Sequence, residues 1–80
     1  MDVKRARNYY DKPCRFVLKS GKEVYGVIWE DNNGLKREHY FASSGEYLLF
    51  KDAERENDIE TCERIKSKVD VKEFVSAEYI

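Results

Sequence analysis

The stretch "EVYGVIWE" at residues 23–30 constrains the fold more than any other part of this 80-residue chain. In an extended strand, successive side chains point to opposite faces of the sheet. The apolar side chains therefore form two rows, one with Val24 and Ile28 and the other with Tyr25, Val27 and Trp29. A strand that is apolar on both faces is central in its sheet or is covered on its second side. Gly26 interrupts the strand, and this predicts a sharp bend or a close backbone approach, as at the corner of a small barrel.

The flanking segments predict a mainly β domain of about five antiparallel strands. Residues 14–19, "CRFVLK", favour a strand, and the "SGK" turn after them places Gly21 where a positive φ angle is needed. Residues 36–43, "KREHYFAS", predict a third strand whose adjacent tyrosine and phenylalanine point to opposite faces. The remaining elements that we expect are a short helix within 3–11, one helical turn over 71–74 and a closing strand over 75–80. Residues 1–80 are thus predicted to form one small domain.

Residues 35–63 exceed what a small barrel requires, and we expect an inserted hairpin or loop there. The apolar run "YLLFK" at 47–51 is typical of a strand, and the polar stretch 52–60 is typical of a loop. Residues 61–71 admit two interpretations. A helical stripe with a capping pair before it favours a helix, whereas strict alternation from Arg64 onward favours a half-buried strand. We favour the strand, because the alternation covers more residues.

Composition argues against several classes of protein. The net charge of −1 argues against a protein that wraps nucleic acid by neutralising phosphates. No stretch approaches the roughly 20 apolar residues that span a bilayer, and the N-terminus lacks the apolar segment of a signal peptide. Cys14 and Cys62 match neither a disulfide framework nor a zinc motif. We therefore expect a cytoplasmic protein with two reduced thiols.

The charged residues are concentrated at two poles. Residues 1–22 hold seven Lys or Arg against two Asp, and residues 52–63 hold six acidic residues against one Arg. Opposite poles allow copies of a chain to associate head to tail, or attract a charged partner. The alternative is that both poles are solvated surfaces that keep the protein dissolved.

No group of residues indicates catalysis or metal binding. His39 is the single histidine, and no Ser or Cys has a spacing that makes it a catalytic partner. The acidic segment 52–63 has carboxylates at several positions of a calcium loop, but Asn57 stands where that loop needs glycine. We therefore predict a protein that is not an enzyme and that has no metal and no cofactor.

The aromatic side chains indicate a binding surface. Both rows of residues 23–30 cannot face one barrel interior, so one of the two rows is exposed, covered by residues 35–63 or buried against another subunit. Exposed aromatic rows with polar rims mark partner sites. The predicted partner-binding residues are Tyr25, Trp29 and Tyr40.

Residues 9–28, "YYDKPCRFVLKSGKEVYGVI", resemble the opening of an Sm-like domain, in which a helix leads to a strand, a short turn and a strand with a central glycine. The matching positions are Leu18, Lys19, Gly21, Lys22, Val24, Gly26 and Ile28. Residues 69–80 resemble the turn and last strand that close such domains. The resemblance implies an SH3-like barrel of Sm-like type and ring-forming self-association. In that family an Asp and an Asn after the central glycine contact RNA, and here Asn32 and Lys36 stand at those positions, with Asp31 one place early.

Two hypotheses for the function follow. The first is a non-enzymatic binding module that acts in protein–protein interaction or self-assembly, through an aromatic face and strand edges. The alternative is an Sm-like RNA-binding protein, whose predicted RNA-binding residues are Asp31, Asn32, Lys36 and Arg37. A protein partner or a second copy is therefore the favoured partner and RNA is the alternative, while no membrane and no small-molecule substrate is indicated.

Overall fold

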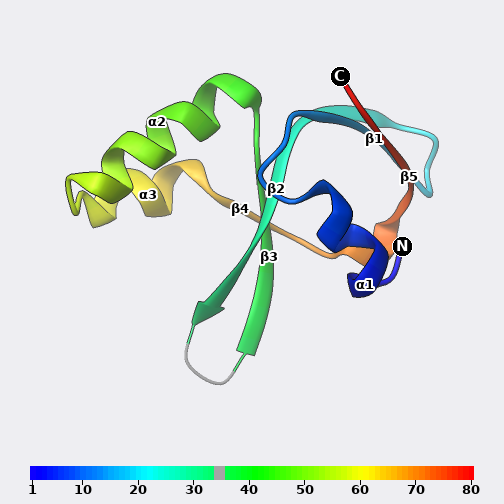
Figure 1. Ribbon diagram of the computed structural model, residues 1–80, viewed down its shortest axis with the longest axis horizontal. Coiled ribbons are helices and arrows are strands. Elements are labelled where there is room, and N and C mark those ends of the chain that lie inside the picture. Colours follow the sequence, from blue (N-terminus) through cyan, green and yellow to red (C-terminus); the bar gives the residue numbers. More distant parts are fainter. Residues whose placement is uncertain (34–35) are drawn as a thin grey trace.

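The structure is a computed structural model that describes residues 1–33 and 36–80 (Figure 1). The strands of the described chain are β1 (Cys14–Leu18), β2 (Glu23–Asn33), β3 (Lys36–Ala42), β4 (Ser67–Val69) and β5 (Phe74–Tyr79). Its α-helices are α1 (Val3–Ala6), α2 (Ser44–Arg55) and α3 (Ile59–Ile65), and its 3-10 helices are η1 (Arg7–Tyr9) and η2 (Val71–Glu73).

The strands form one antiparallel sheet in the order β4-β3-β2-β1-β5, so the last strand lies beside the first. β2 is the longest strand and pairs with both β1 and β3, as its two apolar faces predict. Within residues 1–33 and 36–80, β4 and β5 each pair on one side only, so the sheet is not closed. The prediction of a small, mainly β domain with five antiparallel strands and short helices is confirmed.

Two glycines shape the central strands. Gly21, in the turn between β1 and β2, has a φ angle of +89°, which confirms the predicted positive φ. A Cβ atom on Gly26 would overlap the carbonyl oxygen of Ala42 and would lie 2.7 Å from Cζ of Phe41. The missing side chain of Gly26 therefore lets β3 lie close against β2, which is one of the two roles predicted for it.

One face of the sheet packs against the N-terminal segment and forms the first core. Its buried members are Ala6, Cys14, Phe16, Ile28, Val71 and Phe74. The rings of Phe16 and Phe74 stack with their centroids 4.9 Å apart. Val24 packs against the same cluster, so the predicted row of Val24 and Ile28 lies in this core.

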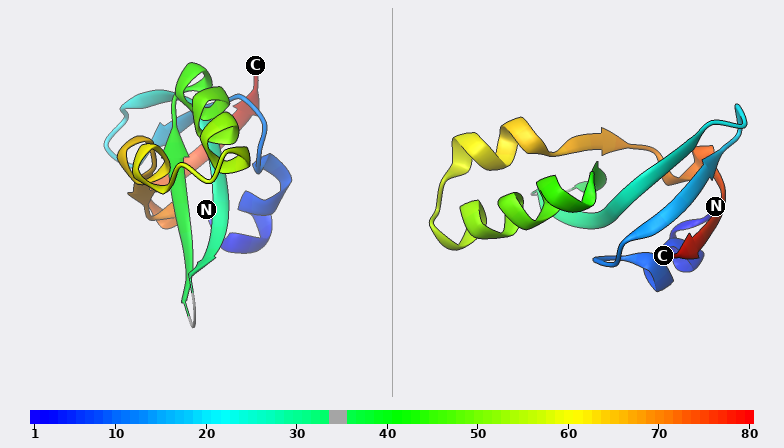
Figure 2. Two further views of the ribbon diagram at one scale, coloured as in Figure 1. Left: turned by 90° about the vertical axis from the view of Figure 1, so that its left-hand side faces the viewer. Right: turned by 90° about the horizontal axis from the view of Figure 1, so that it is seen from above.

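The opposite face of β2 and β3 packs against α2 and α3 and forms the second core. Its buried members are Val27, Trp29, Tyr40, Ala42, Tyr47, Phe50 and Ile65. The Trp29 ring centroid lies 4.8 Å from that of Phe50 and 5.3 Å from that of Tyr47. Figure 2 shows α2 and α3 side by side at one end of the molecule. β2 is apolar on both faces because it separates two cores.

The prediction of an inserted hairpin or loop over 35–63 is wrong for most of that range. Residues 36–42 are β3 of the main sheet, which confirms the third strand predicted over 36–43, and helices fill most of 44–65. Leu35 lies outside the described residues.

The run "YLLFK", predicted as a strand, belongs to α2. Ser43 caps this helix, because its Oγ accepts a hydrogen bond from the Glu46 backbone N–H at 3.3 Å. The residues that α2 buries recur at every third position, which suits a helix: they are Tyr47, Phe50 and Ala53. Helical spacing and the cap thus outweigh the strand preference of the run.

The predicted strand from Arg64 onward is also wrong at its start. α3 continues to Ile65, and the carboxylate of Asp58 caps it by accepting a hydrogen bond from the Thr61 backbone N–H at 3.1 Å. The strand β4 begins at Ser67. The predicted N-terminal helix, helical turn and closing strand are confirmed as α1 with η1, η2 and β5.

Candidate functional site

The aromatic residues predicted for partner binding do not form one exposed row. Trp29 and Tyr40 are each 6% exposed, because they lie in the second core beneath α2 and α3. Tyr25 is 56% exposed. Of the three arrangements left open by the sequence, cover by the chain's own inserted segment is the one that the structure has for Trp29. Of the three predicted partner-binding residues, Tyr25 is therefore the one whose side chain is exposed to a partner.

Tyr25 lies among charged side chains on the outer face of β1, β2 and β5. It is the register partner of Arg15, and its hydroxyl donates a hydrogen bond to Glu23 at 3.4 Å. Arg15 forms ion pairs with Glu23 and with Glu78, the latter at 2.7 Å. This face therefore offers one aromatic ring among paired charges.

The edge strand β5 leaves backbone groups unpaired. The Ile80 N–H donates to the Pro13 carbonyl at 3.3 Å, and hydrogen bonding toward one neighbour alternates along an antiparallel pair. Ala77 pairs with Phe16 in a non-hydrogen-bonded position, so the N–H and C=O of Ala77 point away from β1, as do those of Tyr79. In the described chain no backbone hydrogen bond reaches these outward N–H groups. We call Ala77 and Tyr79 the β5 edge.

The other edge strand, β4, is shorter than β5 and carries a charged residue, Lys68. The same alternation, followed across β2 and β3, points the N–H and C=O of Lys68 outward from β4. The Lys68 ammonium group lies 3.0 Å from Glu38. Short edge strands that carry lysine resist uncontrolled pairing, so the β5 edge is the more open of the two.

An apolar cavity of about 230 Å³ lies where the chain passes from β4 to β5. Its apolar lining consists of Leu18, Val24, Phe41, Val69 and Phe74, and its acidic lining consists of Asp70 and Glu73. The cavity is continuous with the first core, to which Phe74 belongs. We call it the apolar socket; a socket of this kind accepts an apolar side chain and excludes water from it.

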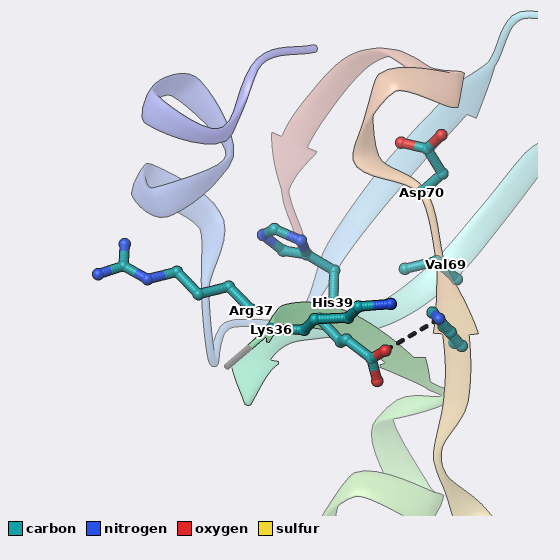
Figure 3. Close-up of a pocket in the computed structure, with 7 residues that line it drawn as sticks. Lys36, Arg37, His39, Val69 and Asp70 are labelled. Carbon is teal, nitrogen blue, oxygen red and sulfur yellow. Dashed lines mark ion pairs between the residues drawn. The ribbon is translucent and has the colours of Figure 1, made fainter. Parts of the chain in front are cut away.

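A second cavity, of about 420 Å³, lies between the start of β3 and β4 (Figure 3). Its basic lining is Lys36, Arg37 and Lys68, and the other residues around it are Glu38, His39, Val69 and Asp70. The hydroxyl of Tyr40 and the ammonium group of Lys68 bind the Glu38 carboxylate and lower its pKa, so part of the negative charge is already compensated. Two predicted RNA-binding residues, Lys36 and Arg37, line this basic cavity together with Lys68, and the Arg37 side chain extends away from Lys68 (Figure 3).

His39 belongs to a buried polar chain behind the basic cavity. Its Nε2 lies 2.5 Å from the Tyr10 hydroxyl, which donates a hydrogen bond to Glu30 at 3.3 Å. Tyr10 has a single proton, so a hydrogen on Nε2 of His39 satisfies all three groups. Burial lowers the pKa of His39, while burial and the Glu30 charge raise the pKa of Tyr10 to about 12. Both rings are therefore neutral at pH 7, and the chain of hydrogen bonds fastens the N-terminal segment to the sheet.

The other two predicted RNA-binding residues are placed differently. Asp31 lines a separate cavity of about 240 Å³ beside α2 and α3, where its carboxylate lies 3.8 Å from the Lys66 ammonium group. Asn32 is exposed on β2 and is the register partner of Arg37. The four residues therefore do not converge on one site.

Sequence reasoning missed three residues of these sites. Lys68 joins the basic cavity because β4 pairs with β3, although the two helices separate these strands in the sequence. Tyr10 and Glu30 meet His39 through a parallel bridge between Tyr10 and Ile28. No local pattern indicates either contact, whereas the apolar socket follows in part from the row to which Val24 belongs.

No family model, curated protein or solved structure matches this chain. Across residues 1–33 and 36–80, no helix has both the length and the apolar character needed to cross a membrane. Geometry and charge are therefore the basis for any functional conclusion.

Proposed function

We propose that this chain is a non-enzymatic binding module that adds an extended segment of a protein partner, in the first place a second copy of itself, to the β5 edge. The observation that carries this proposal is the pair of outward N–H and C=O groups on Ala77 and Tyr79. Unpaired strand edges bind added strands through main-chain hydrogen bonds. The β5 edge supplies these hydrogen bonds without any change in the fold.

The apolar socket supports the proposal because it offers specificity beside the edges. In strand addition, main-chain hydrogen bonds give affinity and pockets for side chains select the sequence. Val69 at the end of β4 and Phe74 at the start of β5 both line the socket. An added segment that places an apolar side chain there covers apolar surface of both strands, which stabilises the complex by about 25 cal/mol per Å².

The fold is also proposed to be SH3-like and of Sm-like type. The return of β5 to the side of β1, the tight turn at Gly21 and the helical turn η2 before β5 support this assignment. The open gap between β4 and β5 is then the place at which a neighbouring subunit completes the sheet.

The test is the solution mass of Ala77→Pro, measured by light scattering on a sizing column. Proline removes the outward N–H of position 77 and leaves the bonds to β1, and edge strands tolerate it. Ala77→Ser keeps the N–H and is the matched control. We expect the natural chain and Ala77→Ser to exceed 9.5 kDa several-fold, and Ala77→Pro, folded by circular dichroism, to form a clearly smaller assembly. A natural chain that stays monomeric, or a folded Ala77→Pro that assembles equally well, contradicts the proposal.

The basic cavity favours RNA binding as a second candidate function. Lys36, Arg37 and Lys68 line one cavity, and such groups bind phosphates. We expect single-stranded RNA to bind with an affinity that falls steeply with salt, and Lys36→Ala with Arg37→Ala to weaken it about tenfold. Lys51→Ala, on α2, is the control. Fluorescence anisotropy with a labelled oligonucleotide at low salt measures both, and no binding even there rules this function out.

A further inference from the structure

A groove between α2 and α3 combines an apolar floor with an acidic rim. Its volume is about 380 Å³. The apolar residues that line it are Leu49, Ala53 and Ile65, and the acidic residues are Glu46, Asp52, Glu56 and Asp58. Arg64 is the basic residue of the lining. Leu49 is 59% exposed, so its side chain points away from the second core. We call this feature the helical groove.

The N-terminal segment of the same chain has the complementary chemistry. Val3 is an exposed apolar residue at the start of α1, at 36% exposure. Lys4, Arg5 and Arg7 follow it and are all exposed. In the described chain none of these three has an ion-pair partner. An apolar side chain flanked by basic ones is what an apolar floor with an acidic rim recognises.

The two features of one copy lie on opposite sides of the sheet. Figure 1 shows α2 and α3 on one side of β2 and β3, and α1 on the other. The second panel of Figure 2 shows the same separation. The Met1 amino group also donates a hydrogen bond to the Phe74 carbonyl at 2.6 Å, which holds the N-terminus beside β5. The segment therefore reaches a helical groove only on a different copy.

We infer, building on the proposed self-association, that the N-terminal segment of one copy docks in the helical groove of a second copy. Val3 meets Leu49 on the groove floor, and Lys4, Arg5 and Arg7 face the acidic rim. The contact is heterologous, because each copy uses its N-terminal segment on one side and its groove on the other. Contacts of this kind continue from copy to copy into a ring or a filament. Since the rim is exposed, salt weakens the contact.

The test isolates one such contact between two different variants. Both carry Ala77→Pro, which removes the proposed β5 edge contact. The first also carries K4Q, R5Q and R7Q and keeps its groove, whereas the second carries D52N and E56Q and keeps its N-terminal segment. Each variant alone lacks one half of the contact. We expect the mixture to form a one-to-one complex by light scattering, at about twice 9.5 kDa, and its Kd to rise at least tenfold between 50 and 300 mM NaCl.

Two leucines in sequence provide the matched control for the groove floor. Leu49 lines the groove, whereas Leu48, at 67% exposure, does not. We expect Leu49→Ser to raise the Kd at least tenfold and Leu48→Ser to leave it unchanged. Equal effects of the two substitutions, or a mixture that remains at 9.5 kDa, overturn the inference. Should Ala77→Pro unfold, the same leucine pair in the otherwise natural chain measures the contact by the change in assembly mass.

The outcomes separate this inference from the proposed function. If Ala77→Pro abolishes assembly of the natural chain and the mixture stays monomeric, strand addition stands and groove docking fails. If Ala77→Pro leaves assembly intact and the mixture forms its complex, groove docking stands and strand addition fails. K19Q with K22Q, which removes basic charge from the same pole outside the N-terminal segment, leaves the complex unchanged if docking is specific.

Discussion

Replacement of Gly26 by alanine tests whether the close approach of β3 to β2 holds the sheet together. The new Cβ overlaps the Ala42 carbonyl oxygen and lies 2.7 Å and 2.8 Å from two ring atoms of Phe41. Backbone must therefore move, which places the overpacking cost near the upper end of its usual range, about 3 kcal/mol. Alanine gains about 0.5–1 kcal/mol over glycine in a strand. The net loss is about 2 kcal/mol, out of about 4–12 kcal/mol expected for a domain of this size.

Urea and thermal unfolding, followed by the fluorescence of the single tryptophan, measure this loss. A domain of this length loses about 4–8 °C of Tm per kcal/mol, so we expect Gly26→Ala to melt roughly 8–16 °C lower. Gly45→Ala is the control, since a Cβ there meets nothing within 4 Å and the residue lies in α2. It should gain up to about 1 kcal/mol from helix propensity. A folded Gly26→Ala within 0.5 kcal/mol of the natural chain would refute the reasoning.

Three further substitutions have definite expected outcomes. Trp29→Ala removes the centre of the second core and should lose about 3–5 kcal/mol, so any lost assembly would reflect unfolding; Trp29→Ala with near-natural stability in urea contradicts the core assignment. Because burial lowers the pKa of His39, stability is full above about pH 6.5 and falls as the pH drops through the folded pKa. We expect His39→Gln to reduce the loss of unfolding free energy between pH 7.5 and pH 5.5, measured by urea titrations at pH 7.5, 6.5 and 5.5. An equal loss in the natural chain and in His39→Gln would contradict this role of His39. Ser43→Ala removes the cap of α2 and should cost about 0.5–2 kcal/mol, while Ser44→Ala, at an exposed neighbouring position, should cost less than 0.5 kcal/mol; equal thermal shifts would show that the cap has no such role.

The sheet could be predicted from the sequence because its signals are local. Alternation in 23–30, the glycine at position 21 and the apolar run after Pro13 fix β1, the turn and β2 without reference to the rest of the chain. The same holds for η2 and β5 at the C-terminus. In each of these segments the residue spacing is compatible with one type of secondary structure.

The helical hairpin was missed because two signals conflicted. "YLLFK" has strand-forming composition, but the capping Ser43 with Glu46 and the threefold spacing of the buried residues favour a helix. Burial decided the outcome, since Tyr47 and Phe50 cover Trp29 only when both lie on one helix face. The aromatic side chains predicted to form an exposed binding face therefore lie, for Trp29 and Tyr40, in the second core.

The sites were less predictable than the fold because they join distant segments. The β5 edge depends on which alternate N–H groups β1 uses, and the basic cavity depends on the pairing of β4 with β3. Lys36 and Arg37 were predicted from their place after β2, yet Lys68 lies beside them only through that pairing. The pairing register of strands that are far apart in the sequence cannot be inferred from any local residue pattern.

Amide hydrogen exchange of the β5 edge, measured at several protein concentrations, tests strand addition most directly. The Ala77 and Tyr79 N–H groups point outward, whereas the Glu78 N–H points to β1 and serves as the internal reference. We expect the Ala77 and Tyr79 amides to exchange quickly in dilute protein and to become protected as assembly proceeds, with Glu78 protected throughout. If the protein assembles while both outward amides remain as fast as in dilute solution, partners do not add to this edge.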